Sequence, residues 1–317
     1  MTGTGKHPRR SPSLRVAIVG GGIVGHVLGR ILVENRHRIT AVVSRSTASA
    51  RRCGRFLSCR NWSTTVDAIP QETRYVMITA PHGAVQDVAR ALARRDGFSW
   101  RGVAVCHASG MLTAAALAPL HDLGAATFSF HPLQTFPRDF APRLIVPSAR
   151  GIVYGVDGDA VGERRARVLA RALDGHVLHV PPEMRAFYHA ACVVASNHLT
   201  TMLGILTAFS HDIAPERKDA LRMFLPILQA TLHNVVVTSP ARALTGPVAR
   251  GGADTLARHF EAILKHAPAL IPYYARMTLE TIRLAMDKQT LSHDQVNELT
   301  RLALSYLDQP LQPEESL

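Results

Sequence analysis

The sequence predicts an α/β domain built on a doubly wound parallel sheet, followed by an all-helical domain. Up to about residue 181, apolar runs of strand length alternate with helical patterns. Pro181-Pro182 then interrupts the chain, and the patterns beyond it are helical with almost no strand signal. With 317 residues, 47% of them hydrophobic, the chain can form two cores. We therefore expect a leader over 1–13, the α/β domain over 14–181 and the helical domain over 182–317.

The first predicted strand runs into a glycine turn. Val16–Val19 is apolar, the next six residues are Gly20-Gly21-Gly22-Ile23-Val24-Gly25, and a helical pattern follows. In the G-x-G-x-x-G arrangement, Gly20 permits the tight turn, Gly22 lets the backbone approach a pyrophosphate, and Gly25 lets the helix pack closely on the sheet. The N–H groups of the first helical turn face the phosphates. The pattern predicts dinucleotide binding, and the alternative is a structural glycine turn.

The end of the second predicted strand, Ile39–Val43, favours NADP over NAD. An NAD site usually carries an acidic residue about 20 positions after the glycines, but this chain has Ser44-Arg45-Ser46 there. A guanidinium and two hydroxyls suit a 2′-phosphate, which a carboxylate would repel. The alternative is a surface arginine without a ligand. The residues predicted to bind the cofactor are Gly20, Gly22, Ile23, Val24, Gly25, Ser44, Arg45, Ser46, Ala80 and Pro81.

Polar residues follow three further predicted strands. The strand 75–79 leads into Ala80-Pro81-His82, the strand 103–106 into His107-Ala108-Ser109-Gly110, and the strand 126–129 into Phe130-His131-Pro132-Leu133. Because ligands of open α/β sheets bind at the carboxyl ends of the strands, we expect the site at this edge. One more unit follows, with a strand over 151–154, a helix over 159–173 and a strand over 177–180.

Five helices are predicted in the second domain, over about 184–209, 215–238, 253–266, 268–287 and 293–306, with Asp254 and Ser292 as candidate caps. The first is apolar nearly all round from Phe187 to His198, which predicts burial. His189, Val193 and Asn197 share one ridge at i, i+4 and i+8. The alternative is that this His and Asn simply bond nearby backbone. Arg250, in the rigid turn 243–252, could hold a substrate carboxylate or be an ordinary surface arginine.

Composition excludes several function classes. The formal net charge is +12, but no arginine tract is interleaved with aromatic residues, so we expect no nucleic-acid partner; an anionic cofactor and substrate suit this charge. Four cysteines without a C-x-x-C pair favour reduced thiols in the cytoplasm. No uninterrupted apolar run of about 20 residues is present, so no membrane span is expected. We predict no metal site.

Several motifs together resemble a known family. They are the runs 107–110, 129–136, 188–198 and 244–251. In order and spacing they resemble Rossmann-like proteins fused to a helical C-terminal domain of unknown function, over about residues 14–306. The resemblance implies an NADP-dependent oxidoreductase similar in layout to pyrroline-5-carboxylate reductase, ketopantoate reductase and the 6-phosphogluconate dehydrogenase group. It also implies a homodimer formed through the helical domain.

Ser109 followed by His131-Pro132 also resembles prephenate dehydrogenase, in which a Ser and a His-Pro contact the reacting hydroxyl. The chain departs from the 6-phosphogluconate type, which has a Lys one turn before the Asn of the first helix of the second domain. Here Val193 precedes Asn197, and that helix has no Lys. The proton donor that the 6-phosphogluconate type uses is therefore missing.

The expected reaction is hydride transfer between the nicotinamide and a small carboxylate-bearing substrate in the cleft between the domains. His131 is the expected proton carrier because an unperturbed imidazole titrates near neutrality. Ser109 would bond the same oxygen, and His189 and Asn197 would orient substrate or nicotinamide. Two alternatives remain: a non-catalytic NADP-binding sensor or scaffold, and a deazaflavin-dependent NADP reductase.

Overall fold

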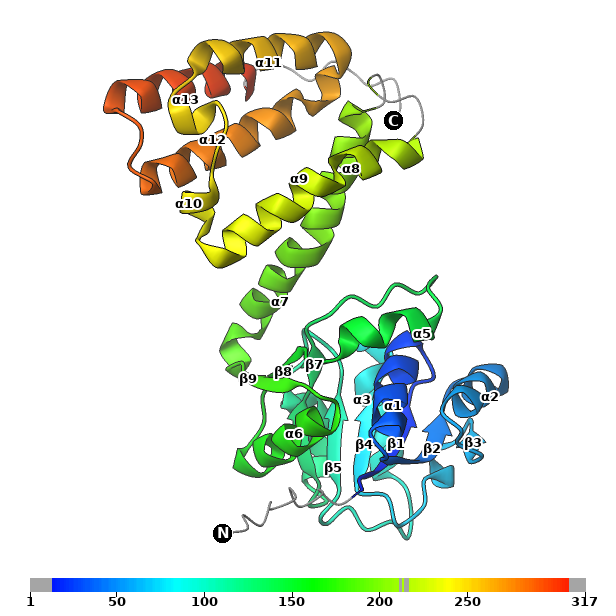
Figure 1. The fold of residues 1–317 in the computed structure, drawn as a ribbon. Helices are drawn as coiled ribbons and strands as arrows, with labels where there is room; N and C mark the ends of the chain where they lie inside the picture. The colour runs from blue at the N-terminus through cyan, green and yellow to red at the C-terminus, as the bar shows by residue number, and fades with distance from the viewer. Residues whose placement is uncertain (1–12, 211–212, 214–216, 308–317) are drawn as a thin grey trace, which may run out of the picture. The chain divides into compact units, whose positions relative to one another are not determined.

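The fold is described from a computed structural model, which describes residues 13–210, 213 and 217–307 (Figure 1). The predicted leader lies outside these residues except for Ser13. The chain divides into two compact units, residues 1–196 and 197–317. The unit boundary lies within a helical stretch that begins after Pro181, where the sequence predicts the change from strands to helices.

The first unit is organised around a six-stranded sheet with the strand order β3-β2-β1-β4-β5-β6, in which all neighbours are parallel. The strands are β1 (Arg15–Val19), β2 (Arg38–Val43), β3 (Trp62–Ser63), β4 (Tyr75–Ile78), β5 (Ala104–His107) and β6 (Ala126–Ser129). The order reverses between β1 and β4, which is where ligands of doubly wound sheets bind. The five strands that the sequence predicts in this region are confirmed, and the short β3 is an additional strand that it did not predict.

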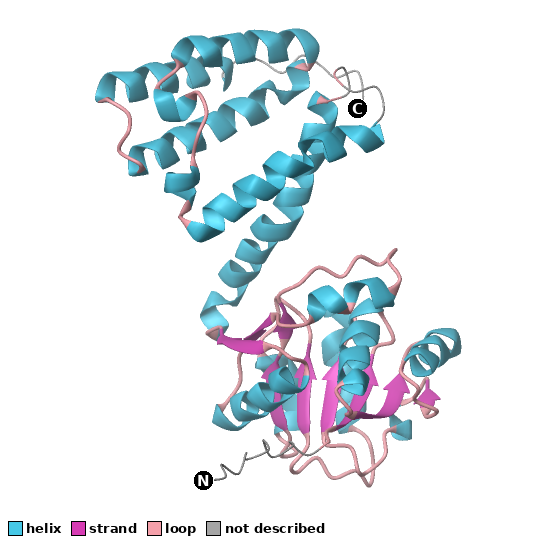
Figure 2. Ribbon diagram, in the orientation of Figure 1, coloured by secondary structure: helices cyan, strands magenta, loops and turns pink. Residues whose placement is uncertain are grey.

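Helices cover both faces of this sheet (Figures 1 and 2). They are α1 (Ile23–Glu34), α2 (Thr47–Phe56), α3 (Val85–Ala93), α4 (Ala118–His121), α5 (Pro142–Ile145) and α6 (Ala160–Ala172). Val16 and Ile18 of β1 enter one core with Leu28 of α1, whereas Ala17 and Val19 enter the other with residues of α3. The period-2 alternation of a strand therefore builds two cores, one on each face.

A separate three-stranded sheet follows, with the order β7-β8-β9. Its strands are β7 (His131–Pro132), β8 (Val153–Val156) and β9 (His176–His179). The sequence predicts no strand at His131-Pro132, but this dipeptide pairs antiparallel with Gly155 and Tyr154 of β8. The candidate histidine is consequently fixed by a backbone ladder as well as by its side chain.

The remaining chain is helical. Its elements are α7 (Arg185–Val193), a π-helical turn (Val194–His198), α8 (Leu199–Phe209), α9 (Arg217–Val237), α10 (Pro240–Ala243), α11 (Ala253–His266), α12 (Ile271–Asp287) and α13 (His293–Leu307). All five predicted helices are confirmed. Ser292 caps α13 by accepting from the Gln295 N–H while Gln295 accepts from the Ser292 N–H, a capping box. Asp254 is not a cap: it lies in the first turn of α11, after the N-cap residue Gly252.

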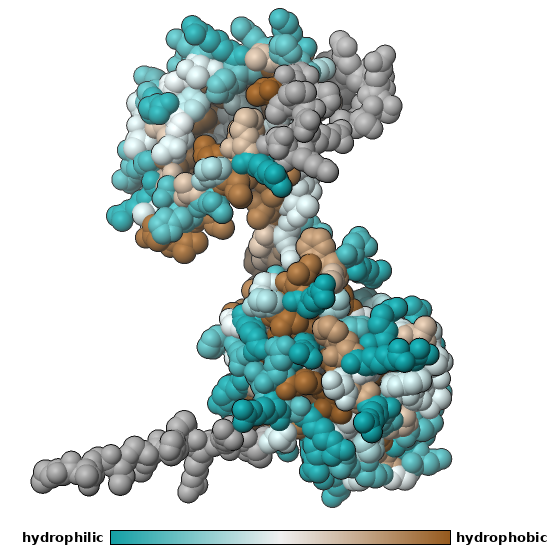
Figure 3. Space-filling model, turned by 45° about the vertical axis from the view of Figure 1, so that its right-hand side comes forward, coloured by the Kyte–Doolittle hydropathy of each residue, from teal (hydrophilic) through white to brown (hydrophobic). Residues whose placement is uncertain are grey.

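The first helix of this series differs from its prediction in two ways. The side chains of Phe187 and Val194 are 71% and 58% exposed, so the expected burial is wrong for a single chain. Apolar residues at the molecular surface appear brown in Figure 3, and exposed apolar side chains of this kind are typical of an interaction surface. The π-helical turn also underwinds the helix, so the regular spacing that would align Asn197 with His189 is interrupted.

Candidate functional site

The glycine turn after β1 is held tightly on one side and open on the other. A Cβ on Gly20, which has φ +121°, would lie 2.5 Å from the Ala80 nitrogen, and one on Gly25 would lie 2.8 Å from Thr79 Oγ1. Thr79 Oγ1 donates to the Gly20 carbonyl at 2.7 Å. A Cβ on Gly22, in contrast, would meet no atom within 4 Å. Gly22 is also the N-cap residue of α1 and provides no side-chain cap, so this helix end can receive a ligand.

The residues predicted to bind the 2′-phosphate lie at the carboxyl end of β2. The Ser44 hydroxyl accepts from the Gly21 N–H at 3.4 Å, and the Ser46 hydroxyl caps α2 by accepting from Ser49. Both oxygens act as acceptors in these bonds, so each hydroxyl proton remains available for a phosphate. Arg45 is exposed beside them, as are Arg51 and Arg52 on α2. No carboxylate occupies residues 44–46.

The carboxyl ends of β4 and β5 are joined by a bond that the sequence did not predict. His82 Nδ1 lies 2.9 Å from the Ser109 hydroxyl oxygen. That oxygen also accepts from the backbone N–H groups of Met111 and Leu112, at 3.3 and 3.2 Å. The predicted site residues Ala80 and Pro81 therefore lead directly into a histidine that contacts the predicted catalytic serine.

His131 and His189 converge over Gly110. The ring centroids of the two histidines are 5.7 Å apart, and a Cβ on Gly110 would lie 3.0 Å from His131 Nε2 and overlap the His189 ring. His131 Nδ1 is 3.0 Å from the Tyr188 hydroxyl. His189 Nδ1 is buried without a hydrogen-bond partner among the described residues. Glycine at position 110 is thus required for both imidazoles to approach the loop that carries Ser109.

A buried ion pair holds these elements together. Arg185, at the start of α7, is 2% exposed and donates to the carbonyls of Ser109 and Gly110 at 3.1 and 3.0 Å. Its guanidinium lies 3.4 Å from Asp157, which is also 2% exposed and accepts from the Ser129 hydroxyl. Because Tyr188 and His189 follow Arg185 by about one turn, this anchor also positions them.

The surroundings of His131 lower the pKa of its imidazole. Burial, together with the positive charge of Arg185 and the neighbouring His189 and His107, lowers the pKa of His131 to about 4. Burial likewise lowers the pKa of His107 to about 4. The choice of His131 as the proton carrier rests on the unperturbed pKa of an imidazole, and burial in this site lowers that value. His131 is a neutral imidazole at neutral pH.

The structure thus brings Ser109, His131 and His189 together in the first unit. The sequence analysis missed four residues of the cluster, Arg185, Asp157, Tyr188 and His82. The available signals were weak: a lone arginine in an otherwise apolar helix, and a histidine directly after the predicted Ala80-Pro81. Asn197 and Arg250 belong to the second unit, where both are exposed, and their roles stay predictions.

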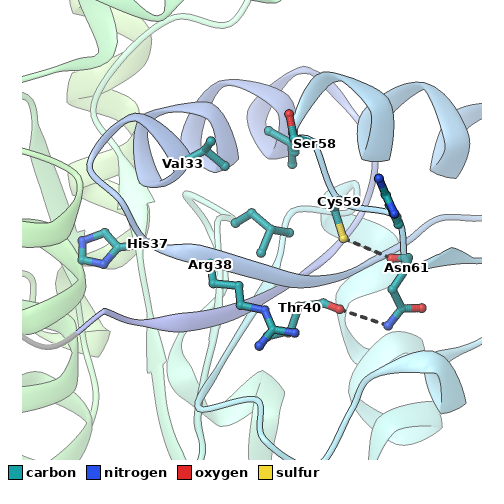
Figure 4. Close-up of a pocket in the computed structure, with 10 residues that line it drawn as sticks. Val33, His37, Arg38, Thr40, Ser58, Cys59 and Asn61 are labelled. Atoms are coloured by element: carbon teal, nitrogen blue, oxygen red, sulfur yellow. Dashed lines mark hydrogen bonds between the residues drawn. The ribbon is translucent and has the colours of Figure 1, made fainter.

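Two other features do not form part of this site. A cavity of about 420 Å³ lies at the amino end of β2, where Arg38, Cys59 and Asn61 line it (Figure 4). It is at the opposite end of the strand from Ser44. Contrary to the sequence expectation, Pro182–Phe209 is long and apolar enough to qualify as a membrane-span candidate. Arg185, Tyr188 and His189 of the same segment bond or pack within the first unit.

Comparisons with known proteins match the two parts of the chain separately. A family model for a Rossmann-like domain matches residues 2–132, and one for a domain of unknown function, DUF2520, matches residues 152–281. This confirms the predicted combination. No curated protein matches the chain.

Several solved structures share the fold. A "putative NADP oxidoreductase" from Bacteroides fragilis has a TM-score of 0.66 at 17% identity, over 86% of this chain and 98% of that one. An imine reductase from Pseudomonas sp. has a TM-score of 0.59 at 16% identity, over 92% and 99%. A reductive aminase from Aspergillus terreus, in complex with NADPH and ethyl-5-oxohexanoate, has a TM-score of 0.56 at 16% identity, over 93% of each chain. At these identities the likeness establishes the fold alone.

Proposed function

We propose that this chain is an NADP-dependent oxidoreductase that transfers hydride between the nicotinamide and a small carboxylate-bearing substrate. The observation that carries the proposal is the open space at Gly22, in a turn where Gly20 and Gly25 are tightly packed. A glycine turn that served packing alone would not need a glycine at its one open position. The turn also lies where the strand order reverses, at the same carboxyl edge of the sheet that β5 and β6 leave toward Ser109 and His131.

NADP, rather than NAD, is the proposed cofactor. Arg45 and the hydroxyls of Ser44 and Ser46 offer a cation and two donors to a 2′-phosphate. Two fold neighbours point in the same direction, because one is named an NADP oxidoreductase and the other is in complex with NADPH.

The nicotinamide would supply the hydride chemistry, and the cluster would manage the proton. His131, neutral at neutral pH, is suited to accept a proton from a substrate hydroxyl when Nδ1–H donates to the Tyr188 oxygen and leaves Nε2 free. Ser109 would bond the same substrate oxygen. His189, and Asn197 from the second unit, would orient the substrate or nicotinamide, and Arg250 would bind a carboxylate.

Calorimetry followed by a turnover screen tests this proposal. NADP should release heat on binding and NAD should bind more weakly. A screen of 2-oxo acids, imines and 3-hydroxy acids, monitored by NADPH absorbance, should then show turnover. NADP binding without any turnover would favour the alternative, a non-catalytic NADP-binding sensor or scaffold. The absence of binding by either nucleotide would refute both.

We further propose that the protein is a homodimer through its helical domain. Apolar side chains stay exposed on α8 and α9, including Leu199, Ile227 and Val236 at 45%, 63% and 76%. Such a surface suits a second copy, and α7, bonded into the first unit, argues against a membrane span. We expect no nucleic-acid partner. The free cysteines, three of them buried, support a cytoplasmic location.

A further inference from the structure

The Ser109 hydroxyl has one proton to donate and two lone pairs with which to accept. Its oxygen accepts from the backbone N–H groups of Met111 and Leu112, at 3.3 and 3.2 Å, and lies 2.9 Å from His82 Nδ1. Because the two N–H groups occupy the lone pairs, the bond to His82 uses the hydroxyl proton. Ser109 is therefore the donor in this bond, and a neutral His82 accepts at Nδ1 and carries its ring proton on Nε2.

The loop that carries Ser109 is held in place by buried groups. Arg185 donates to the carbonyls of Ser109 and Gly110, at 3.1 and 3.0 Å. Asp157 pairs with Arg185 and accepts from the Ala114 N–H at 2.6 Å. Arg185 and Asp157 are each 2% exposed. The fixed loop therefore presents the Ser109 hydroxyl in one position, without further ordering of the backbone.

His82 and His131 differ in their access to solvent. His82 is exposed, and a Cβ on Gly83, the next residue, would meet nothing within 4 Å, so the space beside it is open. His131 is half-buried, and its Nε2 lies 3.0 Å from the position that a Cβ on Gly110 would take. The same loop therefore contacts the exposed imidazole through Ser109 and the inner imidazole through Gly110.

Resting on the proposed function, we propose that His82 is the solvent-facing end of a proton relay that returns His131 to its starting state through Ser109. In the proposed reaction Ser109 and His131 both bond the substrate oxygen. When the product has left, a water molecule bonds both groups in place of that oxygen. Imidazole is the side chain that takes up and releases protons near neutral pH, which suits the exposed end of such a relay.

Every proton in the relay is accounted for. In the oxidative direction the substrate C–H bond breaks and its hydride goes to the nicotinamide of NADP. The O–H electrons form the C=O double bond, and the O–H proton goes to His131 Nε2. After product release that proton passes to the water, a water proton passes to Ser109 Oγ, and the proton that Ser109 held passes to His82 Nδ1. His82 releases its Nε2 proton to solvent, and exchange with solvent restores its resting tautomer. The reverse sequence supplies His131 with a proton for reduction.

NMR on the full chain without any ligand tests the resting state that the relay requires. The chain has 16 histidines, so in protein with nitrogen-15-labelled histidine the signals of His82 are assigned as those missing from His82→Asn. We expect Nδ1 of neutral His82 to carry no proton, and Ser109→Ala to give a measurable fraction with the proton on Nδ1. A proton on Nδ1 in the parent protein, or unchanged His82 signals in Ser109→Ala, would overturn the inference.

Kinetics then separate proton transfer from a structural role. The oxidation of 2-hydroxypentanoate or 3-hydroxybutanoate by NADP is followed in dilute buffer. We expect His82→Ala to lower kcat at least about tenfold, less than the roughly 10²–10⁴-fold of a lost general base because solvent replaces an exposed group in part. Since the proton leaves after the product, kcat/KM should change by less than about twofold. Added imidazole should restore kcat, and an unchanged kcat in His82→Ala would overturn the relay.

Two further variants serve as controls, and circular dichroism verifies that each one folds. His82→Asn keeps an acceptor for the Ser109 hydroxyl near the position of Nδ1 but cannot carry a proton, so it should be as slow as His82→Ala. If His82→Asn instead matches the parent, His82 merely holds Ser109 and the relay is wrong. His121→Ala removes another exposed histidine, on α4, and should keep the parent kcat.

The two arms leave no undecided outcome. If neither hydroxy acid turns over, the tautomer of His82 in the parent and in Ser109→Ala decides the inference. Failure to bind NADP in calorimetry would instead refute the proposed function, so the two failures are distinguishable.

Discussion

Replacing Gly22 by alanine separates a cofactor cradle from a structural turn. Gly22 has φ −83° and ψ −175°, an extended conformation that alanine adopts freely, and a Cβ there would meet nothing within 4 Å. The substitution should therefore change the free energy of unfolding by less than about 1 kcal/mol, the balance of a slightly poorer N-cap and a less flexible unfolded chain.

The same methyl group would occupy the space in which a pyrophosphate approaches the backbone. We expect the Kd for NADP to rise by about tenfold or more, which is a loss of about 1.4 kcal/mol in binding free energy. The matched control is Gly25→Ala, whose Cβ would overlap the Gly20 carbonyl and lie 2.8 Å from Thr79 Oγ1. Overpacking of this kind costs about 1–3 kcal/mol, so this variant should lose stability first.

Urea denaturation and calorimetry with NADP, both performed on the same preparations, measure the two effects. Gly22→Ala should keep the denaturation midpoint and lose affinity, and Gly25→Ala should lower the midpoint. If Gly22→Ala is as stable as the parent protein and binds NADP equally well, the turn does not contact a pyrophosphate. The cofactor proposal would then lose the observation that carries it.

Three further predictions concern the other parts of the site. His131→Asn should lower turnover by about 10²–10⁴-fold with little change in NADPH affinity, and unchanged steady-state turnover would remove His131 from the proton step. Arg45→Glu should weaken NADP binding at least about tenfold while NAD binding changes little, and an equal loss for both nucleotides in calorimetry would contradict a 2′-phosphate contact. His107 has its pKa lowered from 6.5 to about 4, so the unfolded chain binds more protons between these values and stability should fall as the pH drops through that range, by about 3 kcal/mol in all. Urea midpoints of the parent and His107→Asn measured across this pH range test it, and parallel pH dependences would contradict the assignment.

The strands and helices themselves could be predicted from local sequence patterns. The run Val16–Val19 is continuously apolar because its strand is buried on both faces, and the glycines that follow are required by the turn next to it along the chain. The five helices of the second half follow a 3.6-residue period, and Ser292 with Gln295 marks the start of the last one. Each of these signals lies within a few residues of the structure it predicts.

The exposure of the helix at Phe187 could not be predicted in the same way. Its apolar side chains predict burial, but the pattern does not identify which surface would cover them. The strand at His131-Pro132 was missed because a two-residue strand has no periodicity, and its formation depends on Gly155 of a strand more than twenty residues later.

The sequence by itself determined the succession of strands and helices along the chain, the glycine turn and the edge at which polar residues gather, and it is the basis for proposing NADP, since all of these depend on neighbouring residues. Only the tertiary structure decided which side chains meet there. Arg185 reaches the carbonyls of Ser109 and Gly110 across about 75 residues of sequence. Burial, with the charge that Arg185 brings near, lowers the pKa of His131 and keeps it a neutral imidazole, because a pKa depends on desolvation and on charges that are near in space and distant in sequence.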